Sequence, residues 1–269
     1  MTSSGETRRI ALFSDVHGNL PALEAVLADI RGRKMAEVYC LGDLVGYGPD
    51  PSGVIAAIRN SGIPTVRGNY DDGIGHRRGN CGCYYANEQA ESDGRASYAF
   101  TDAALNDDER AWLASLPDEL RLGIDDLRLL MVHGSPRRIN EYLLPDRSDE
   151  QLTRLAVEAN ADVVCVGHVH VPYHRSMATS DGREIHYVSS GSVGKPKDGD
   201  PRAAWVELIL GTPDEVNAST DDAAAGPAAS SHIWLGVVVH RVAYDVSAVV
   251  AAMASAGLPP ALGQALAQA

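Results

Sequence analysis

Side chains that can bind metal ions recur directly after apolar runs in the first 170 residues of the chain. They form a D-x-H pair, an aspartate in "GD", an asparagine in "GN", a histidine in "HG" and an H-x-H pair: Asp15, His17, Asp43, Asn69, His133, His168 and His170. Each alone is typical of an ordinary loop, but four of the nine histidines fall in this one positional class. The joint pattern indicates one site assembled from distant segments.

The types of these side chains favour transition metals. Neutral imidazole and carboxylate without thiolate suit Mn, Fe, Zn, Ni or Co better than Ca or Mg. Seven ligands are too many for one such ion, whereas two ions that share a bridging carboxylate fit the number. Paired ions about 3.5 to 4 Å apart suit in-line displacement at phosphorus, because one generates hydroxide and both neutralise phosphate oxygens. Alternate residues of an extended segment point the same way, so we expect each of the D-x-H and H-x-H pairs to bind one ion.

The elements that position these residues read as an α/β fold. The pattern predicts strands and helices in the order β 8–14, α 19–33, β 37–42, α 51–62 and β 63–68, then a helical stretch 88–116, β 127–134, α 149–160 and β 161–168. Strands that alternate with helices predict a largely parallel sheet. The carboxyl ends of such strands lie along one edge of the sheet, where ligand sites form.

The second half of the chain predicts an antiparallel sheet, with strands at 171–178, 183–190, 203–210 and 232–245. Residues 212–231 contain few large apolar side chains and predict a flexible loop, and a helical pair is expected at about 245–268. The chain shows no internal repeat. Two sheets covered by helices can share one core, so we expect residues 1–269 to form a single domain.

The charge balance bears on partners. Lys and Arg number 23 against 36 Asp and Glu, a formal net charge of −13, which disfavours bulk nucleic-acid or anionic-membrane binding. No segment approaches the roughly 18 apolar residues of a membrane span, so we expect a cytoplasmic protein. Cys40 and Cys165 lie in apolar runs and are expected as buried thiols, whereas Cys81 and Cys83 form "CGC" near His76, where a metal or redox role stays open.

Five segments in order, "DVHGN", "GDLVGYGPDP", "RGNYD", "HGSP" and "GHVH", resemble the motifs of the calcineurin-like metallophosphoesterases, and "GSVGKPKDGDPRA" resembles a loop of bacterial single-domain members. The resemblance implies a four-layer α/β/β/α sandwich, two mixed sheets flanked by helices, and a dinuclear site. It places Asp15, His17, Asp43 and His170 on the first metal. Asp43 would bridge to a second metal, which is held with Asn69, His133 and His168. The neutral Asn69 carbonyl would add no negative charge, and its amide nitrogen could touch the substrate.

The chain departs from the family pattern at Tyr70, where relatives carry the histidine often assigned to protonating the leaving alkoxide. A phenol, with a pKa near 10, can donate a proton but offers no cationic charge. We therefore expect good leaving groups to be preferred. Asp71 matches the family's final acid and is expected to fix the loop. Arg67 precedes "GN" as in branches whose arginine contacts phosphate, and a surface arginine is the alternative.

Lys195, Lys197 and Arg202 are candidates for a phosphate clamp, or else belong to a solvated charged loop. The sequence thus predicts a phosphoesterase that uses two divalent transition-metal ions and attacks phosphate mono- or diesters of small molecules, nucleotides among them, with metal-bound hydroxide. Diadenosine tetraphosphatase or Ser/Thr protein phosphatase-like activity is an alternative, although the second arginine of "GDYVDRG" is absent. A non-catalytic binding scaffold is the alternative of another class, and the oligomeric state is left open.

Overall fold

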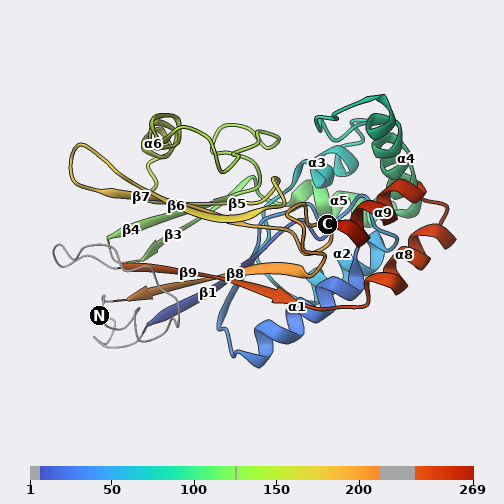
Figure 1. Ribbon diagram of the computed structural model, residues 1–269, viewed down its shortest axis with the longest axis horizontal. Coiled ribbons are helices and arrows are strands. Elements are labelled where there is room, and N and C mark those ends of the chain that lie inside the picture. The colour runs from blue at the N-terminus through green and yellow to red at the C-terminus, as the bar shows by residue number, and fades with distance from the viewer. Residues whose placement is uncertain (1–6, 125, 212–233) are drawn as a thin grey trace.

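Two mixed β-sheets lie face to face with helices outside them (Figure 1), in a computed structural model that describes residues 7–124, 126–211 and 234–269. One sheet has the order β2-β1-β8-β9 and contains β1 Arg8–Phe13, β2 Glu37–Cys40, β8 Ala203–Gly211 and β9 Trp234–Val242. The other has the order β3-β4-β5-β7-β6 and contains β3 Glu119–Ile124, β4 Leu127–Val132, β5 Val163–Val166, β6 Pro172–Ala178 and β7 Glu184–Ser190. The predicted pair of mixed sheets flanked by helices is confirmed.

The helices cover the outer faces and one end of the sheets. They are α1 Leu20–Gly32, α2 Pro51–Ser61, α3 Asn69–Gly75, α4 Glu88–Ala104, α5 Asp107–Ser115, α6 Asp149–Glu158, α8 Val246–Ser255 and α9 Pro260–Gln268. The Asn19 side chain accepts a hydrogen bond from the Ala22 amide and caps α1 as predicted. The α1 face that includes Leu23 and Ile30 is buried. Among the described residues, no helix combines the length and apolar character that a membrane crossing needs.

The core between the sheets is built from alternate residues of neighbouring strands. Ile10 and Leu12 of β1 share a buried cluster with Met131 of β4 and Val206 and Leu208 of β8. In a strand, alternate side chains point to the same face, so these positions turn one face of each sheet inward. Cys40 and Cys165 are buried free thiols, as the sequence predicts.

Three parts of the strand and helix prediction are wrong. Residues 63–68 form a single bridge, between Thr65 and Cys40, rather than a strand, since Pro64 has no backbone N–H to extend a ladder. The helical stretch 88–116 divides because Asn106 and Glu109 form a capping box that starts α5. The second half does not build its own sheet, because β8 pairs antiparallel with β1.

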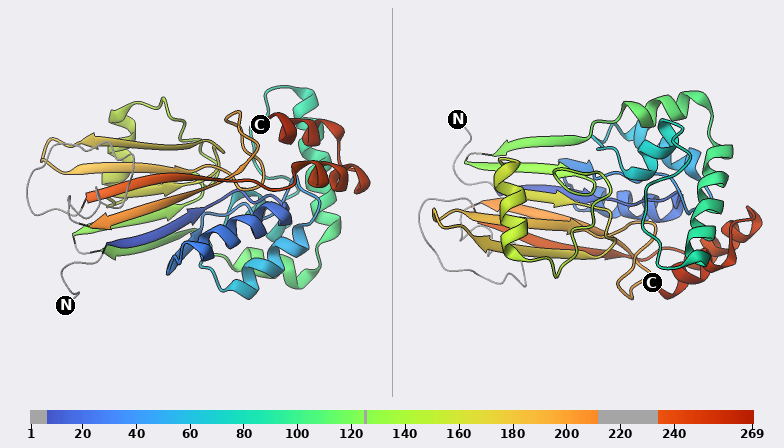
Figure 2. Two further views of the ribbon diagram at one scale, coloured as in Figure 1. Left: turned by 60° about the horizontal axis from the view of Figure 1, so that its bottom comes forward. Right: turned by 90° about the horizontal axis from the view of Figure 1, so that it is seen from above.

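Two elements, α3 and β3, are absent from the prediction. Glu119–Ile124 pairs antiparallel with β4 and begins with alternating exposed and half-buried residues. The predicted helices near the C-terminus are present, and α8 and α9 pack on each other and lie beside α4, whose Phe100 contacts their cluster (Figure 2). The loop expected at 212–231 lies outside the described residues.

Candidate metal centre

The seven candidate ligands lie together and are buried, none more than 4% exposed. Asp15 and His17 follow β1, Asp43 follows β2, His133 follows β4, and His168 and His170 follow β5, while Asn69 is the first residue of α3. The strand ends of both sheets therefore supply ligands to one place. Five segments that are distant in the sequence meet there.

Asp15, His17 and His170 form the first triad. The Nε2 atom of His170 lies 3.1 Å from Asp15 Oδ1 and 3.2 Å from His17 Nε2. His17 Nε2 is 3.6 Å from the same Asp15 oxygen. Two imidazole nitrogens and one carboxylate oxygen thus face a common point, as three ligands of one ion would.

Asp43, His133 and His168 form the second triad. His133 Nε2 lies 3.4 Å from Asp43 Oδ2 and 3.0 Å from Asn69 Oδ1, so the Asn69 carbonyl faces this triad too. The same Asp43 oxygen is 3.8 Å from His17 Nε2 of the first triad. Asp43 therefore lies between the triads, where a bridging carboxylate would be.

Backbone carbonyls orient three of the imidazole rings. The Nδ1 atoms lie 3.0 Å from Val45 O for His17, 2.8 Å from Leu41 O for His133, and within hydrogen-bonding distance of Lys195 O for His170. A carbonyl accepts only from a protonated Nδ1, so whenever the ring is neutral its Nε2 keeps the lone pair that binds a metal ion. The carbonyls thus select the tautomer that binds metal.

The ligand loops are strained. Asp15, His17, Asp43, His168 and His170 adopt left-handed backbone conformations, with φ of 55°, 49°, 54°, 66° and 61°. Such conformations cost energy for non-glycine residues and cluster at functional sites. They also correct the expectation of extended pairs: Asp15 and His17 reach one triad from a tight loop, whereas His168 and His170 divide between the two triads.

The electrostatics of the cluster favour cations. Burial lowers the pKa of His168 to about 4 and that of His170 to about 3, so both rings are neutral at pH 7. Burial alone would lower the pKa of His133 as well, but Asp43 and Asp15 raise it to about 9. The two carboxylates therefore draw positive charge into the site.

Two buried polar atoms of the cluster, Asp15 Oδ1 and His168 Nε2, make no hydrogen bond. Leaving such atoms unpaired costs roughly 1 to 3 kcal/mol each. A divalent cation in each triad would satisfy both atoms, and the mixed imidazole, carboxylate and amide ligands suit a transition metal. The residues present thus fit two ions.

The two residues that follow Asn69 in the sequence, Tyr70 and Asp71, lie in different surroundings. The Asp71 carboxylate accepts hydrogen bonds of 2.9 Å from the backbone amides of Asp43, Leu44 and Gly68, and so ties α3 to the Asp43 loop. The Tyr70 ring is fully buried and packs against His17, with ring centroids 5.6 Å apart. Burial raises the pKa of the Tyr70 hydroxyl well above its usual value.

The Arg67 side chain contacts the C-terminal end of α5. Its guanidinium donates to the backbone carbonyls of Ala114 and Leu116, at 2.8 and 3.1 Å, and pairs with Asp118. The structure therefore does not bring the Arg67 side chain into the ligand cluster. An arginine that follows an apolar run carries no sequence signal for this contact.

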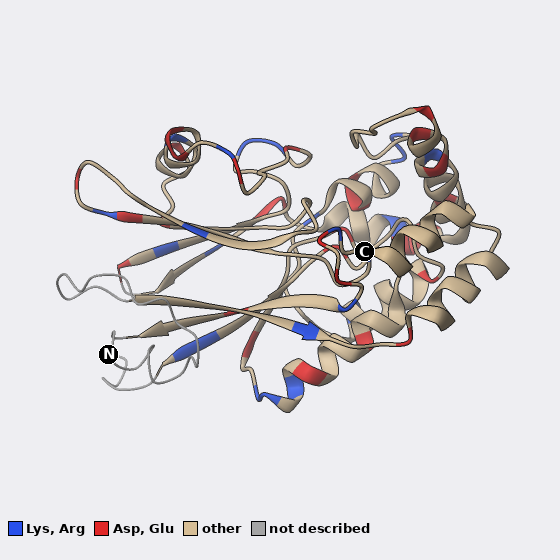
Figure 3. Ribbon diagram, viewed as in Figure 1, with Lys and Arg blue, Asp and Glu red and all other residues tan. Residues whose placement is uncertain are grey.

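The basic residues of the loop after β7 also lie in different surroundings. Arg202 pairs with Asp200 at 2.6 Å, whereas the Lys195 ammonium lies 4.5 Å from the centre of the Tyr47 ring. After burial, the charge of Lys197 is the next cause that lowers the pKa of His170, so this ammonium is within electrostatic reach of the ligands. Acidic and basic residues are interspersed along α1, α4 and α6, whereas α8 and α9 contain neither (Figure 3).

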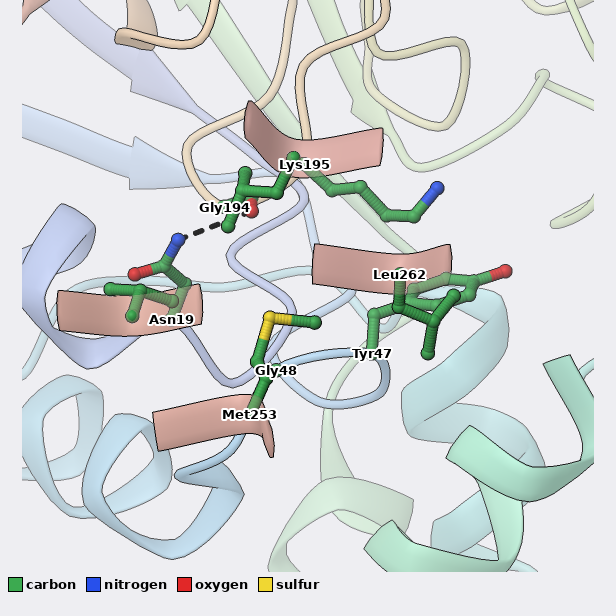
Figure 4. Close-up of a pocket in the computed structure, with 9 residues that line it drawn as sticks. Asn19, Tyr47, Gly48, Gly194, Lys195, Met253 and Leu262 are labelled. Carbon is green, nitrogen blue, oxygen red and sulfur yellow. Dashed lines mark hydrogen bonds between the residues drawn. The ribbon is translucent and has the colours of Figure 1, made fainter. Parts of the chain in front are cut away.

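Two neighbours of the ligands were not predicted. The Tyr142 ring packs at a tilt of 32° against His168, with ring centroids 4.0 Å apart. A small crevice beside the ligand loops is bounded by α8 and α9 (Figure 4), and is lined by Asn19, Tyr47, Gly48, Gly194, Lys195, Val249, Met253, Leu262 and Leu266. Aromatic and aliphatic residues such as these also build ordinary cores, so their types alone give no signal.

Comparisons with known proteins agree with this geometry. Residues 9–209 match the Calcineurin-like phosphoesterase superfamily domain. An uncharacterized protein of Methanocaldococcus jannaschii is 32% identical over 208 residues, in a match that covers 73% of this chain and 80% of that protein.

Two solved structures resemble the chain over nearly its whole length. A metallophosphoesterase from Sphaerobacter thermophilus has a TM-score of 0.67 at 29% identity, over 98% of this chain and 99% of its own. A hypothetical protein from Pyrococcus horikoshii has a TM-score of 0.73 at 24% identity, over 96% and 97%. With the family match spanning well over half of the sequence, the chain belongs to the calcineurin-like phosphoesterase superfamily.

Proposed function

We propose that the protein is a dinuclear-metal-dependent phosphoesterase that hydrolyses phosphate diesters or monoesters of small molecules. The observation that carries the proposal is the pair of buried triads on either side of Asp43, each with one buried ligand atom that makes no hydrogen bond. Bound divalent ions would supply the Lewis acidity that makes water nucleophilic at neutral pH and offset the charge of the phosphate oxygens.

The chain's own residues would hold and order the centre. Asp15, His17 and His170 would hold one ion, and Asn69, His133 and His168 the other, with Asp43 shared between them. The carbonyl bonds to the rings and the Asp71 bonds to the Asp43 loop keep these side chains in place. Such prior ordering lowers the cost of gathering charge at the reacting phosphate.

Lys195 and Lys197 are our candidates for contact with the substrate phosphate. Neither forms an ion pair with another of the described residues, whereas Arg67 and Arg202 are each paired with an aspartate. The charge of Lys197 acts on His168 and His170, at the centre of the site. An unpaired ammonium beside a phosphate site favours anionic substrates.

Neither Asn69 nor Tyr70 is a good proton donor for the leaving group. Both N–H groups of the Asn69 amide are occupied, since they donate to the Cys81 carbonyl at 2.9 Å and to Cys83 Sγ at 3.1 Å, so this nitrogen is not free to touch a substrate as the sequence suggested. The Tyr70 hydroxyl is buried, and its raised pKa makes it a poor donor. The proposal therefore favours substrates with acidic leaving groups, such as aryl esters.

Two alternatives lead to different results. A diadenosine tetraphosphatase or Ser/Thr protein phosphatase-like enzyme would prefer a dinucleotide or a phosphoprotein to simple diesters. A non-catalytic scaffold would turn over none of them, but the retention of all seven ligand types argues against a decayed site.

A substrate panel tests the proposal. Protein reconstituted with Mn²⁺, Ni²⁺ or Zn²⁺ is expected to hydrolyse aryl phosphodiesters faster than alkyl ones. The Asp43→Ala variant, measured in parallel, is expected to be inactive. Equal rates on aryl and alkyl esters would contradict the leaving-group argument, and undiminished turnover by the variant would contradict the shared-metal site.

A further inference from the structure

A disulfide lies directly behind one of the proposed metal ligands. Cys81 and Cys83 are joined by a disulfide, with their Cα atoms 5.4 Å apart. The Asn69 amide nitrogen donates to the Cys81 carbonyl at 2.9 Å and to Cys83 Sγ at 3.1 Å. Its other end, Oδ1, is 3.0 Å from His133 Nε2. The disulfide segment thus contacts the amide from the side opposite the second triad.

These contacts fix which end of the amide faces the triad. A side-chain amide has an oxygen that accepts and a nitrogen that only donates, and rotation by half a turn exchanges them. The Cys81 carbonyl can only accept a hydrogen bond, so it requires the nitrogen on its side. The oxygen is then directed to the triad, where a metal ion needs an electron pair.

The disulfide segment also connects to a second loop beside the triad. The Asn140 amide donates 3.0 Å to the Gly82 carbonyl, and Gly82 has a left-handed backbone with φ of 66°. Two residues beyond Asn140, the Tyr142 ring packs against His168. The short ring closed by Cys81 and Cys83 is therefore hydrogen-bonded both to Asn69 and to the loop that leads to Tyr142. Among the described residues it makes no hydrogen bond to Asp15, His17 or His170.

We propose that the Cys81–Cys83 pair is a redox-sensitive positioning element for the second metal site. The inference rests on the proposed dinuclear function. With the disulfide closed, the segment holds Asn69 ready to bind an ion. With it open, the segment gains freedom, the amide loses its fixed partners, and the second ion binds more weakly while the first is retained.

The redox step is a two-electron exchange. Opening the S–S bond takes two electrons and two protons and gives two thiols, and a phosphine reductant supplies the electrons and is converted with water to the phosphine oxide. Closing proceeds by exchange with a small-molecule disulfide: the thiolates of Cys83 and Cys81 bond to each other, and two small thiols leave. Half-buried Cys83 and exposed Gly82 make the segment reachable.

The test measures metal retention rather than turnover. Wild-type protein loaded with Mn²⁺ is prepared oxidised and phosphine-reduced, and reagents are removed so that no thiol competes for metal. A thiol count under denaturing conditions should give two when oxidised and four when reduced, because Cys40 and Cys165 are free in both. Dialysis against graded chelator then gives the affinity of each ion.

Reduction should lower the affinity for the second ion by about tenfold or more and leave the affinity for the first unchanged. Losing a hydrogen bond that orients a metal ligand typically weakens metal binding by this amount. A Cys81→Ser/Cys83→Ser variant keeps Cys40 and Cys165 and should bind like the reduced protein, without response to either treatment. Thermal unfolding confirms that this variant is folded, and the wild-type pair of states carries the test if it is not.

Two results would overturn the inference. If oxidised and reduced protein both retain two ions equally, the segment does not position Asn69, although the proposed metal centre stands. If even the oxidised protein holds no divalent ion, the proposed function fails and the inference fails with it.

Discussion

The two triads of the centre are made of similar side chains but are held by different parts of the molecule. The first is tied to the interior: the Asp15 carbonyl accepts 2.8 Å from Ser192 Oγ, and its carboxylate accepts 2.9 Å from the His168 amide. The second depends on loops, because Asn69 rests on the Cys81–Cys83 segment and His168 on the Tyr142 ring. If the two triads hold ions as proposed, the difference predicts that binding at the first triad is fixed by the core and binding at the second responds to the loops around it.

Asp43 is a member of the second triad and also lies beside His17 of the first, so its loss should remove the contrast altogether. Asp43→Ala takes away the shared carboxylate, and we expect activity to fall by roughly 10³-fold or more, with neither ion held firmly. Initial rates on an aryl phosphodiester with Mn²⁺ measure this. Asp108→Ala, a change at an exposed acid in the first turn of α5, is the matched control and should stay within about twofold. If Asp43→Ala keeps a tenth or more of wild-type activity, Asp43 does not bridge two ions.

Removing one ligand from either triad should affect metal binding differently. Asn69→Ala removes a neutral ligand from the loop-held site, so half-maximal activity should need about 10- to 100-fold more Mn²⁺ and excess metal should restore most of the rate. His170→Ala removes a ligand of the first triad, and excess metal should not restore the activity of this variant. Metal titration of activity for the two variants gives the comparison. Identical titration curves would mean that the sites are equivalent.

Lys197 tests how substrate charge is bound beside both triads. Lys197→Ala should raise KM by about tenfold with little change in kcat, because the ammonium would contact the phosphate in ground and transition states alike. Lys197→Arg, which keeps the charge, should lie between wild type and the alanine variant. Arg202→Ala, which alters a residue paired with Asp200, serves as control. A fall in kcat alone would instead assign Lys197 to the chemical step.

Tyr70 should have the smallest effect. Its ring supports His17 from the core, and Tyr70→Phe keeps that packing while removing a buried hydroxyl. We expect rates within about threefold of wild type on both aryl and alkyl esters. If the hydroxyl were the proton donor, the alkyl ester rate would fall by about tenfold or more while the aryl rate would not.

The sequence was informative where the chemistry of a residue fixes its place. The D-x-H, "GD", "GN" and "GHVH" segments follow short apolar runs, and strands that end at one edge bring such residues together. The prediction of a strand at 63–68 was wrong because it rested on apolar composition alone. Pro64 limits this segment to a single bridge. Periodicity also gave no warning that Asn106 interrupts a helix, although its capping box was there to read.

What the sequence did not reveal depends on contacts between distant residues. Nothing in "RGNYD" shows that Arg67 would pair with Asp118, or that the Asn69 nitrogen would face the Cys81 carbonyl. Likewise "CGC" left a metal role and a redox role open, and only the position of the segment beside Asn69 favours the second. Such contacts arise from loop paths, which hydrophobic patterning does not determine.

Counting metal ions per chain tests the central claim most directly. Wild-type protein loaded with Mn²⁺ and dialysed should hold two ions, located by anomalous scattering on either side of Asp43. Asn69→Ala should keep the ion beside Asp15, His17 and His170 and lose occupancy at the other. Active wild-type protein with one ion or none would contradict the account.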